Sequence, residues 1–307
     1  IIDQYIMKGG RILWLIDGVQ LSKENLSTVG FSPAWALDIN LNDQLFRYGV
    51  RINPVLLQDV QCVLVPVNVA PQDQSPHFEP MPWYFAPLLL TSYQHPITKN
   101  ITEIKTDFCS SIDVVGDNPH TKSTVLLATS NNTHIIPTPS TIDLRILPKA
   151  NDKEYFNLGY VPVAILVEGS FESVFRNRML PAGLININKV QYQSKPTRQI
   201  FVADGDIIRN ETSGLATDST TLSLGFDRYM NQQFGNKDFI QNAVLYLTDD
   251  EGWMQLRTKT FKLRLLNKNA VRDKKNICQV INISLPIILL ALFGIIYQWI
   301  RKRKYSK

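Results

Sequence analysis

The sequence predicts an α/β domain with a layered, mainly parallel sheet, followed by one C-terminal transmembrane helix. Short apolar runs recur along the chain, and helix-like segments lie between several of them. Near the C-terminus, residues 280–300 contain no charged side chain, and a basic cluster follows at once. The apolar runs are residues 62–69, 124–130, 161–169, 199–204 and 242–248.

Glycines mark the ends of the first elements. Residues 3–7 are typical of the end of a helix, because residues 9–10 are both glycine, the usual stop signal. A buried strand is predicted directly afterwards, over residues 12–16. A second helix is predicted over residues 42–46, because it opens on Asn-Asp, residues that cap helix starts, and Gly49 follows it.

The later apolar runs predict a buried sheet. They are continuous rather than alternating, as expected of strands covered on both faces. Helices are predicted over residues 171–180 and 237–244. Strands that alternate with helices favour a mainly parallel sheet.

Several segments predict loops or an exposed edge. Residues 70–83, 130–157, 187–198 and 210–223 are rich in proline or polar residues and are predicted to be loops. Residues 257–265 alternate basic and apolar side chains, which predicts a half-exposed strand.

The chain divides into four parts by composition. We expect an α/β domain over residues 1–267, truncated at its N-terminus because the chain opens on Ile1 without a signal-like segment. Residues 268–279 are predicted to be a basic linker, residues 280–300 a transmembrane helix and residues 301–307 a basic tail.

The apolar segment has the composition of a membrane anchor. A helix needs about 20 apolar residues to cross the hydrocarbon, which residues 280–300 just supply. A buried core helix is the alternative, and Asn282, Ser284 and Pro286 favour it, whereas the abrupt basic end favours the anchor. The predicted membrane-interface residues are Tyr297, Trp299, Arg301, Lys302, Arg303 and Lys304. Because both flanks are basic, the charge rule favours a cytoplasmic C-terminus only weakly.

The charge distribution argues against nucleic-acid binding. Residues 257–279 and 301–307 together hold 13 of the 32 basic side chains and one of the 27 acidic ones. Residues 1–256 therefore have 19 basic and 26 acidic side chains, a net charge of −7. An acidic domain of this kind lacks the basic surface that binds phosphate backbones.

Asp204, Gly205 and Asp206 follow the predicted strand 199–204 and have two interpretations. Two carboxylates at the end of a strand can bind Mg²⁺ or act as acid and base. Alternatively they form a turn, in which glycine permits an unusual backbone angle and Asn210 extends the hydrogen-bond network. Because no glycine-rich phosphate loop, second acidic cluster or paired-histidine motif accompanies them, we favour a structural or recognition turn.

Other candidate residues are isolated. The four histidines stand singly, and the cysteines have no metal-ligand spacing, although Cys62 and Cys109 can pair if the domain is extracytoplasmic. Ser130 and Thr133 follow a predicted strand but lack the nucleophile motif of hydrolases. Residues 83–85 (Trp-Tyr-Phe) are either an aromatic platform for a carbohydrate or peptide, or core residues beneath a loop. We therefore predict no catalytic residue, metal or cofactor.

Several segments together resemble the auxiliary, substrate-binding-like subunit of the gliding-motility ABC transport system, the GldG family. The segments are residues 41–62, 161–178, 201–211, 225–259 and the terminal anchor. Within them, FVADGDIIRNE holds Asp204, Asp206 and Asn210, and GNKDFIQN holds Asn236 and Asn242. The resemblance covers nearly the whole chain and depends on the order of the segments.

The resemblance implies a periplasmic domain related to glutamine-amidotransferase-like and intraflagellar-transport-like folds, tethered to the bacterial inner membrane. It implies two partners, a membrane permease and a cytoplasmic ATPase, and it supplies no catalytic residue. We therefore expect a non-enzymatic auxiliary subunit that acts as a scaffold or in cargo recognition. The alternatives are an envelope hydrolase or metal-dependent enzyme that uses Asp204 and Asp206, and an envelope carbohydrate- or peptide-binding module.

Overall fold

The structure is a computed structural model that describes most of the chain. The described residues are 1–70, 74–116, 118–144, 146, 148–149, 152–180, 190–213, 220–258 and 268–305. The chain divides into two compact units, Ile1–Lys259 and Thr260–Lys307, which are described separately below. The boundary therefore lies eight residues before the predicted end of the domain at residue 267.

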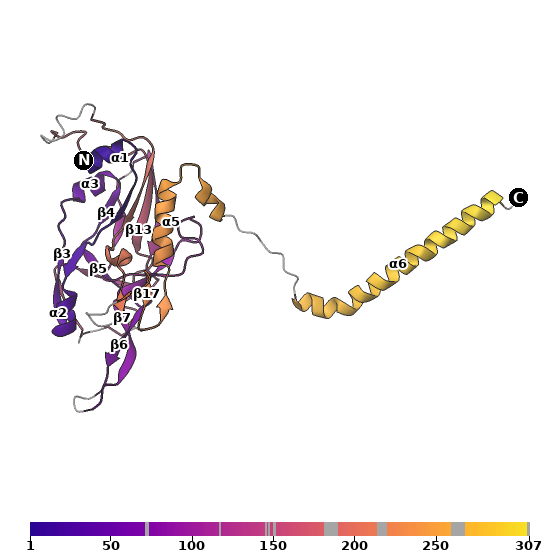
Figure 1. Ribbon diagram of the computed structural model, residues 1–307, viewed down its shortest axis with the longest axis horizontal. Coiled ribbons are helices and arrows are strands. Elements are labelled where there is room, and N and C mark those ends of the chain that lie inside the picture. Colours follow the sequence, from indigo (N-terminus) through magenta and orange to yellow (C-terminus); the bar gives the residue numbers. More distant parts are fainter. Residues whose placement is uncertain are drawn as a thin grey trace. The chain divides into compact units, whose positions relative to one another are not determined.

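The first unit is built on one curled, mixed sheet of seven strands (Figure 1). In spatial order its strands are β1 (Ile12–Leu15), β14 (Thr197–Val202), β13 (Pro162–Gly169), β10 (Thr121–Ala128), β7 (Phe78–Thr91) and β6 (Cys62–Asn68), with β8 (Ile104–Lys105) also paired to β7. In this sheet only β1 and β14 run parallel, and the other pairs are antiparallel. The prediction of a mainly parallel sheet is therefore wrong.

The continuous apolar runs do not result from a parallel arrangement of the strands. In β13, residues 163–167 are all buried, because both faces of this central strand are covered. Burial on both faces produces a continuous apolar run in a strand of either direction. Four of the five apolar runs therefore fall on strands of this sheet, but the pattern carried no information about how the strands pair.

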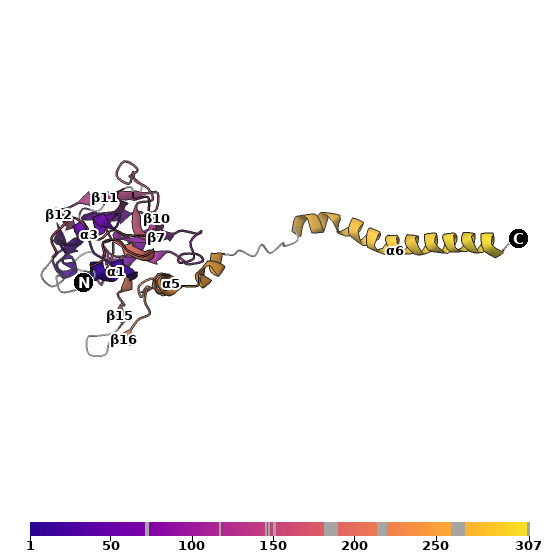
Figure 2. The same ribbon diagram turned by 90° about the horizontal axis from the view of Figure 1, so that it is seen from above.

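Smaller sheets accompany the main sheet, and some of their strands lie in regions that were predicted to be loops. A three-stranded sheet contains β2 (Val19–Leu21), β3 (Phe31–Ala36) and β12 (Ser140–Asp143), and two-stranded sheets pair β5 (Val55–Asp59) with β11 (Thr133–Pro137) and β4 (Val50–Ile52) with β9 (Ile112–Val114). Two short hairpins pair β15 (Thr212–Ser213) with β16 (Thr220–Thr221) and β17 (Phe226–Asp227) with β18 (Gln232–Gln233). Figure 2 shows the β15–β16 hairpin projecting from the unit.

Four of the predicted loops thus contain strands, wholly or in part. Residues 130–157 hold β11 and β12, residues 210–223 hold β15 and β16, and β7 begins inside 70–83. β14 begins inside residues 187–198. Of the strand predicted over residues 257–265, the first two residues lie in a 3-10 helix, and the others lie outside the described residues.

The helices of this unit are short except for one. They are α1 (Ile2–Met7), α2 (Lys23–Thr28), α3 (Asn42–Arg47) and α5 (Asn236–Thr248), with 3-10 helices η1 (Asp206–Ile208) and η2 (Trp253–Thr258). The glycine stop after α3 is confirmed, since Gly49 has a φ of +92°. Its start differs from the prediction, because Leu41 occupies the N-cap and makes no side-chain capping bond.

Two predicted elements have the wrong type. The strand predicted over residues 242–248 belongs to α5, whose buried residues recur with helical spacing while Val244 and Leu245 are exposed. The helix predicted over residues 171–180 is a turn region. Its backbone pairs with a distant segment instead, for example through the N–H of Ser173, which donates to the carbonyl of Tyr192 (3.0 Å).

The main core lies between the seven-stranded sheet and the helices. α5 runs alongside the sheet and contacts β1, β8 and β14 (Figure 1). Phe239 and Ala243 on α5 are fully buried in the same cluster as Phe201 of β14 and Ile165 of β13. This packing fixes the N-terminus of α5 next to the end of β14, where the candidate site lies.

The second unit contains α6 (Lys268–Tyr305), a single helix with Pro286 inside it. Its residues Lys274–Tyr305 are long and apolar enough to cross a membrane. The predicted transmembrane segment 280–300 is part of this helix, and so are the residues 268–279 predicted to be a linker.

The predicted membrane-interface residues lie at the end of α6. The rings of Tyr297 and Trp299 are more than half exposed. The guanidinium of Arg303 lies 4.0 Å from the centre of the Trp299 ring, and Arg301, Lys302 and Lys304 are exposed beside it. Aromatic and basic side chains in this arrangement suit the boundary between hydrocarbon and headgroups.

We predict that the two faces of α5 differ strongly in their effect on stability. Phe239→Ala removes a fully buried ring and should destabilise the unit by about 3–5 kcal/mol. Leu245→Ala, at an exposed position of the same helix, should cost less than about 0.5 kcal/mol. Thermal unfolding of the full-length chain in detergent micelles measures both; similar losses for the two variants would contradict the observed helix orientation.

Candidate functional site

The candidate site forms where the two parallel strands end. Asp17 follows β1, and Asp204, Gly205 and Asp206 follow β14, so the turn identified in the sequence meets the end of the neighbouring strand. The N–H of Gly205 donates to Oδ1 of Asp17 at 2.6 Å. Carboxyl ends of parallel strands meet at one edge, which is where α/β proteins place their sites.

Glycine is required at position 205 because the side chain of Asp17 approaches the backbone closely there, and not because of the backbone angle. The φ of Gly205 is −77°, a conformation open to every residue, so the predicted unusual angle is wrong. A Cβ atom at this position would lie 2.9 Å from Oδ2 of Asp17. Glycine therefore allows the carboxylate of Asp17 to reach the backbone of the turn.

Asp204 holds the turn together from inside the protein. Its side chain is fully buried, with Oδ1 accepting from the N–H of Asp206 (2.8 Å) and Oδ2 from the N–H of Asp107 (3.2 Å). Burial raises the pKa of Asp204 well above its usual value, and the nearby carboxylates of Asp17 and Asp206 add to this effect. Both oxygens are thus engaged by backbone donors, one of them in the same turn.

Asp206 lies at the surface of the cleft and is part of an ion-pair cluster. The ammonium of Lys23, from the start of α2, bonds to Asp206 (2.5 Å) and also to Asp107. Arg209 approaches the other oxygen of Asp206 at 3.5 Å. Burial raises the pKa of Asp107, and Lys23 opposes that rise. Burial lowers the pKa of Lys23, but the two carboxylates outweigh it and the pKa is raised overall.

A second ion-pair cluster lies on the other side of the same cleft. The ammonium of Lys105, on β8, bonds to Glu211 (2.5 Å) and to Asp227 (2.8 Å). Asp227 is buried and also accepts from the N–H groups of Tyr229 (3.0 Å) and Met230 (2.9 Å). Burial lowers the pKa of Lys105, but its bonds to the two carboxylates outweigh this effect and raise the pKa overall.

Asn236 joins the helix α5 to both neighbouring segments. Its amide nitrogen donates to the carbonyls of Lys105 (2.7 Å) and Ile207 (3.2 Å), and its amide oxygen accepts from the N–H of Lys105 (3.0 Å). Gly225 packs closely against it, since a Cβ there would lie 2.8 Å from the Asn236 side chain. This predicted residue therefore has a structural role at the wall of the cleft.

The other two asparagines lie in different places. Asn210 lines the cleft, and its amide nitrogen donates to the carbonyl of Leu222 (2.8 Å). Asn242 is buried, donates to the carbonyl of Ile97 (3.0 Å) and accepts from Arg257. Of the six residues predicted in this turn region, Asp206, Asn210 and Asn236 line the cleft, and Asp204, Gly205 and Asn242 do not.

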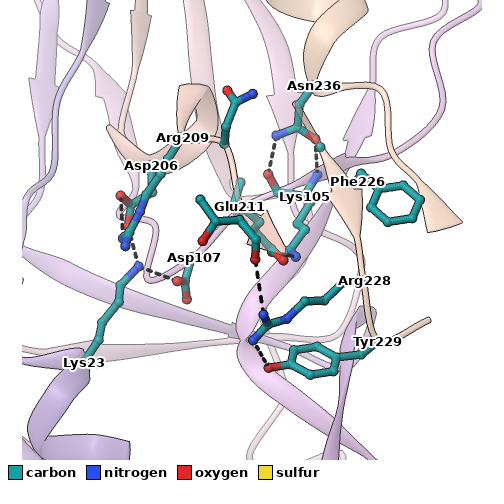
Figure 3. A pocket seen from close by; sticks show the side chains of 14 residues that line it. Lys23, Lys105, Asp107, Asp206, Arg209, Glu211, Phe226, Arg228, Tyr229 and Asn236 are labelled. Atoms are coloured by element: carbon teal, nitrogen blue, oxygen red, sulfur yellow. Dashed lines mark hydrogen bonds and ion pairs between the residues drawn. The ribbon is translucent and has the colours of Figure 1, made fainter. Parts of the chain in front are cut away.

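The two clusters face one open cleft with a volume of about 620 Å³. Figure 3 shows Lys23 and Asp206 on one side of this cleft and Arg228 and Tyr229 on the other. The lining residues are Lys23, Lys105, Thr106, Asp107, Asp206, Arg209, Asn210, Glu211, Thr212, Gly225, Phe226, Arg228, Tyr229 and Asn236. The cleft is therefore polar, with four basic and three acidic side chains and two aromatic rings.

The predicted aromatic platform does not form. Tyr84 and Phe85 are buried, with 4% and 2% of their surfaces exposed. The half-buried ring of Trp83 packs on Phe85 and Phe108, with centroid distances of 5.3 and 5.8 Å. Residues 83–85 are therefore packing residues, as in the second of the two interpretations.

The other isolated candidates also have packing or hydrogen-bonding roles. Ser130 and Thr133 donate their hydroxyls to the buried carboxylate of Asp59 (2.6 and 2.9 Å). Burial raises the pKa of Asp59, while these hydrogen bonds oppose the rise. Cys62 and Cys109 are both free, and burial raises the pKa of the Cys62 thiol to about 12.

Within the part of the chain that the structure describes, no group of three His, Cys, Asp or Glu side chains is arranged to hold a metal ion. The acidic side chains of the cleft are instead bonded to lysines. The cleft is suited chemically to recognition through hydrogen bonds and charges.

The lining residues that were not predicted from the sequence include Lys23, Lys105, Asp107 and Arg228. These four come from α2, β8, the β8–β9 connection and the turn after β17. Each is a single charged residue in a polar stretch, so no local motif distinguishes it. Arg209 and Glu211 lie in the FVADGDIIRNE segment and Arg228 lies in segment 225–259, so these three stand in segments already singled out, although none was predicted as a site residue.

We predict that Gly205→Ala destabilises the unit by about 1–3 kcal/mol, because the new Cβ would collide with Asp17. The same change in an Asp17→Ala background should cost less, since the obstructing carboxylate is gone. A double-mutant cycle based on thermal unfolding measures this coupling. Equal costs in both backgrounds would show that the close contact does not explain the glycine.

We predict a characteristic pH dependence for Asp204→Asn. Because the folded pKa of Asp204 is raised, the folded chain keeps a proton that the unfolded chain loses above about pH 3.9. The contribution of Asp204 to the free energy of unfolding is therefore largest below that pH. It decreases as the pH rises toward the pKa that Asp204 has in the folded chain. The difference in melting temperature between the wild type and Asp204→Asn should therefore narrow from pH 4 to pH 7.

Asp113→Asn is the control, because the pKa of Asp113 is shifted in the opposite direction to that of Asp204. Burial raises the pKa of Asp113, but the hydrogen bonds from Arg51 and Asn53 together with the charge of Arg51 outweigh it and lower the pKa overall. The advantage of the wild type over Asp113→Asn should therefore widen only below about pH 5, where this carboxyl group ionises, and should not narrow up to pH 7. If the Asp204 difference also widened, the assigned pKa direction would be wrong.

The comparisons with known proteins agree with part of the sequence interpretation. The model of an ABC transporter auxiliary family, described as an ABC-type uncharacterized transport system, matches residues 1–243. The match includes the seven-stranded sheet and the turn after β14, ends inside α5 and does not include α6. A comparison with curated proteins finds no match. The chain therefore belongs to the ABC transporter auxiliary family.

Proposed function

We propose that this chain is a non-enzymatic, membrane-anchored auxiliary subunit of an ABC transport complex linked to gliding motility. It acts as a scaffold or in cargo recognition, and another subunit hydrolyses ATP. The family match over residues 1–243 is the observation that carries this proposal. The chain's resemblance to the GldG family adds the link to gliding, and the permease and ATPase are the partners it implies.

A membrane anchor supports the assembly part of the proposal. α6 is long and apolar enough to cross a membrane, and exposed basic residues follow its aromatic ones. We propose that the α/β unit lies in the periplasm, with the anchor in the inner membrane and the basic tail in the cytoplasm. The excess of positive charge after the segment supports this orientation.

The chemistry of the cleft supports recognition over catalysis. Both oxygens of Asp204 accept from backbone N–H groups, so this carboxyl group has a structural use. Asp206 and Asp107 share the ammonium of Lys23. An acid–base pair needs groups that are open to a substrate. We therefore prefer the recognition role to the envelope enzyme that uses Asp204 and Asp206.

The fold relationship remains part of the proposal as well. A mixed sheet with α5 packed beside it is compatible with a divergent member of the glutamine-amidotransferase-like group. Fold likeness carries no catalytic function by itself. A carbohydrate- or peptide-binding module remains the second candidate, with the polar cleft in place of residues 83–85 as its binding surface.

We predict that the full-length chain, extracted from its own membranes in mild detergent, recovers a permease and an ATPase. Affinity purification followed by mass spectrometry measures this. A tagged single-span membrane protein of similar abundance is the control, and it should recover neither. Recovery of the chain without either partner, under conditions that preserve another ABC complex from the same membranes, would contradict the proposal.

A further inference from the structure

The charges that line the cleft are not equally available to a ligand. The carboxylates of Asp107 and Asp206 share the ammonium of Lys23, and Glu211 shares the ammonium of Lys105 with the buried Asp227. In each cluster one lysine neutralises part of two negative charges at short range. A ligand that sought these carboxylates would have to displace a bonded lysine, at the cost of the existing ion pairs.

The two arginines of the cleft are much less engaged. The side chain of Arg209 is 65% exposed, and its nearest carboxylate oxygen, on Asp206, is 3.5 Å away. The Lys23 ammonium already bonds to the second oxygen of that carboxylate. A guanidinium has five N–H donors, so Arg209 keeps most of its capacity for a further oxygen ligand.

Arg228 is held in position by neutral groups. Its Nη2 donates to the hydroxyl of Tyr229 (2.6 Å), its Nη1 donates to the carbonyl of Thr212 (3.2 Å), and the guanidinium lies 4.7 Å from the centre of the Tyr229 ring. The carboxylates of Glu211 and Asp227 also act on Arg228 through their charges, but among the described residues their ion pairs are with Lys105. A guanidinium that is oriented in advance by bonds to neutral groups loses little freedom when it binds an anion.

Other features of the cleft favour an organic anion. Asn236, the first residue of α5, lines the cleft, so the positive end of a 13-residue helix lies at its wall. The ring of Tyr229 lies beside Arg228, and the ring of Phe226 lines the same cleft, so both offer apolar surface to a ligand (Figure 3). The three acidic side chains would repel the doubly charged phosphate more strongly than the singly charged carboxylate.

We propose that this cleft binds a carboxylate-bearing ligand, an acidic peptide or a small organic acid, through the guanidinium groups of Arg209 and Arg228. Each guanidinium forms paired hydrogen bonds with one carboxylate, the geometry that suits both groups. The inference rests on the proposed function, because it names the class of ligand that the recognition domain takes.

The test is isothermal titration of the full-length chain in detergent micelles. The probes are an acetylated and amidated tetraglutamate peptide, the matching tetraglutamine peptide, glutarate and inorganic phosphate. We expect saturable binding of tetraglutamate or glutarate, and whichever binds identifies the source of the carboxylate. Tetraglutamine should not bind. Absence of binding by both carboxylate probes, or binding of phosphate alone, would overturn the proposal.

Arginine variants assign the binding to the cleft. Arg209→Gln and Arg228→Gln should each weaken the binding about tenfold, and the lysine variants at these positions should lose less because they keep the charge. Arg178→Gln is the matched control, since Arg178 is 59% exposed and lies outside the cleft, paired with Asp43. Unchanged affinity in both cleft variants, or an equal loss in the control, would contradict the assignment.

The outcome is separable from that of the affinity purification. If the permease and ATPase are recovered but no carboxylate probe binds, only the ligand inference fails. If a carboxylate probe binds through the arginines but no partner is recovered, the proposed assembly with a permease and an ATPase is contradicted, and the proposed binding site is supported.

Discussion

The edge of the sheet where the two parallel strands end depends on one buried carboxyl group, that of Asp204. A carboxyl group removed from water needs hydrogen-bond donors, and here the backbone N–H groups of Asp107 and Asp206 supply them. These bonds join the β8–β9 connection to the end of β14. The glycine at position 205 lets Asp17 approach from β1 at the same point. Three segments that are far apart in the chain are thereby brought to one edge of the sheet.

This convergence determines the electrostatics of the cleft. Carboxylates that would repel one another share the lysines at positions 23 and 105, and each lysine lies between two acids. The remaining ligand-binding capacity belongs to the exposed arginines 209 and 228. Such a surface is suited to a charged partner with complementary groups, in keeping with the role we propose for this member of an ABC transporter auxiliary family. Separately, α6 is long and apolar enough to cross a membrane.

Much of the secondary structure was predictable because its signals are local. Glycine stops and apolar runs located α1, β1, β6, β13 and β14 within a few residues. Residues 242–248 were mistaken for a strand because a short apolar run has no period of its own. The helix predicted over the overlapping residues 237–244 is confirmed, and it extends from Asn236 to Thr248. Likewise, residues 171–180 were mistaken for a helix because their backbone partners lie twenty residues away.

By itself, the sequence located five of the seven strands of the main sheet, showed that the terminal apolar segment is long enough for a membrane, and favoured a structural or recognition turn at Asp204-Gly205-Asp206. The tertiary structure alone decided strand direction, since burial on both faces produces the same apolar pattern in parallel and antiparallel strands. It also decided the composition of the cleft. Ion pairs between residues separated by a hundred positions or more leave no local pattern, because their partners are selected by how the sheet brings its loops together.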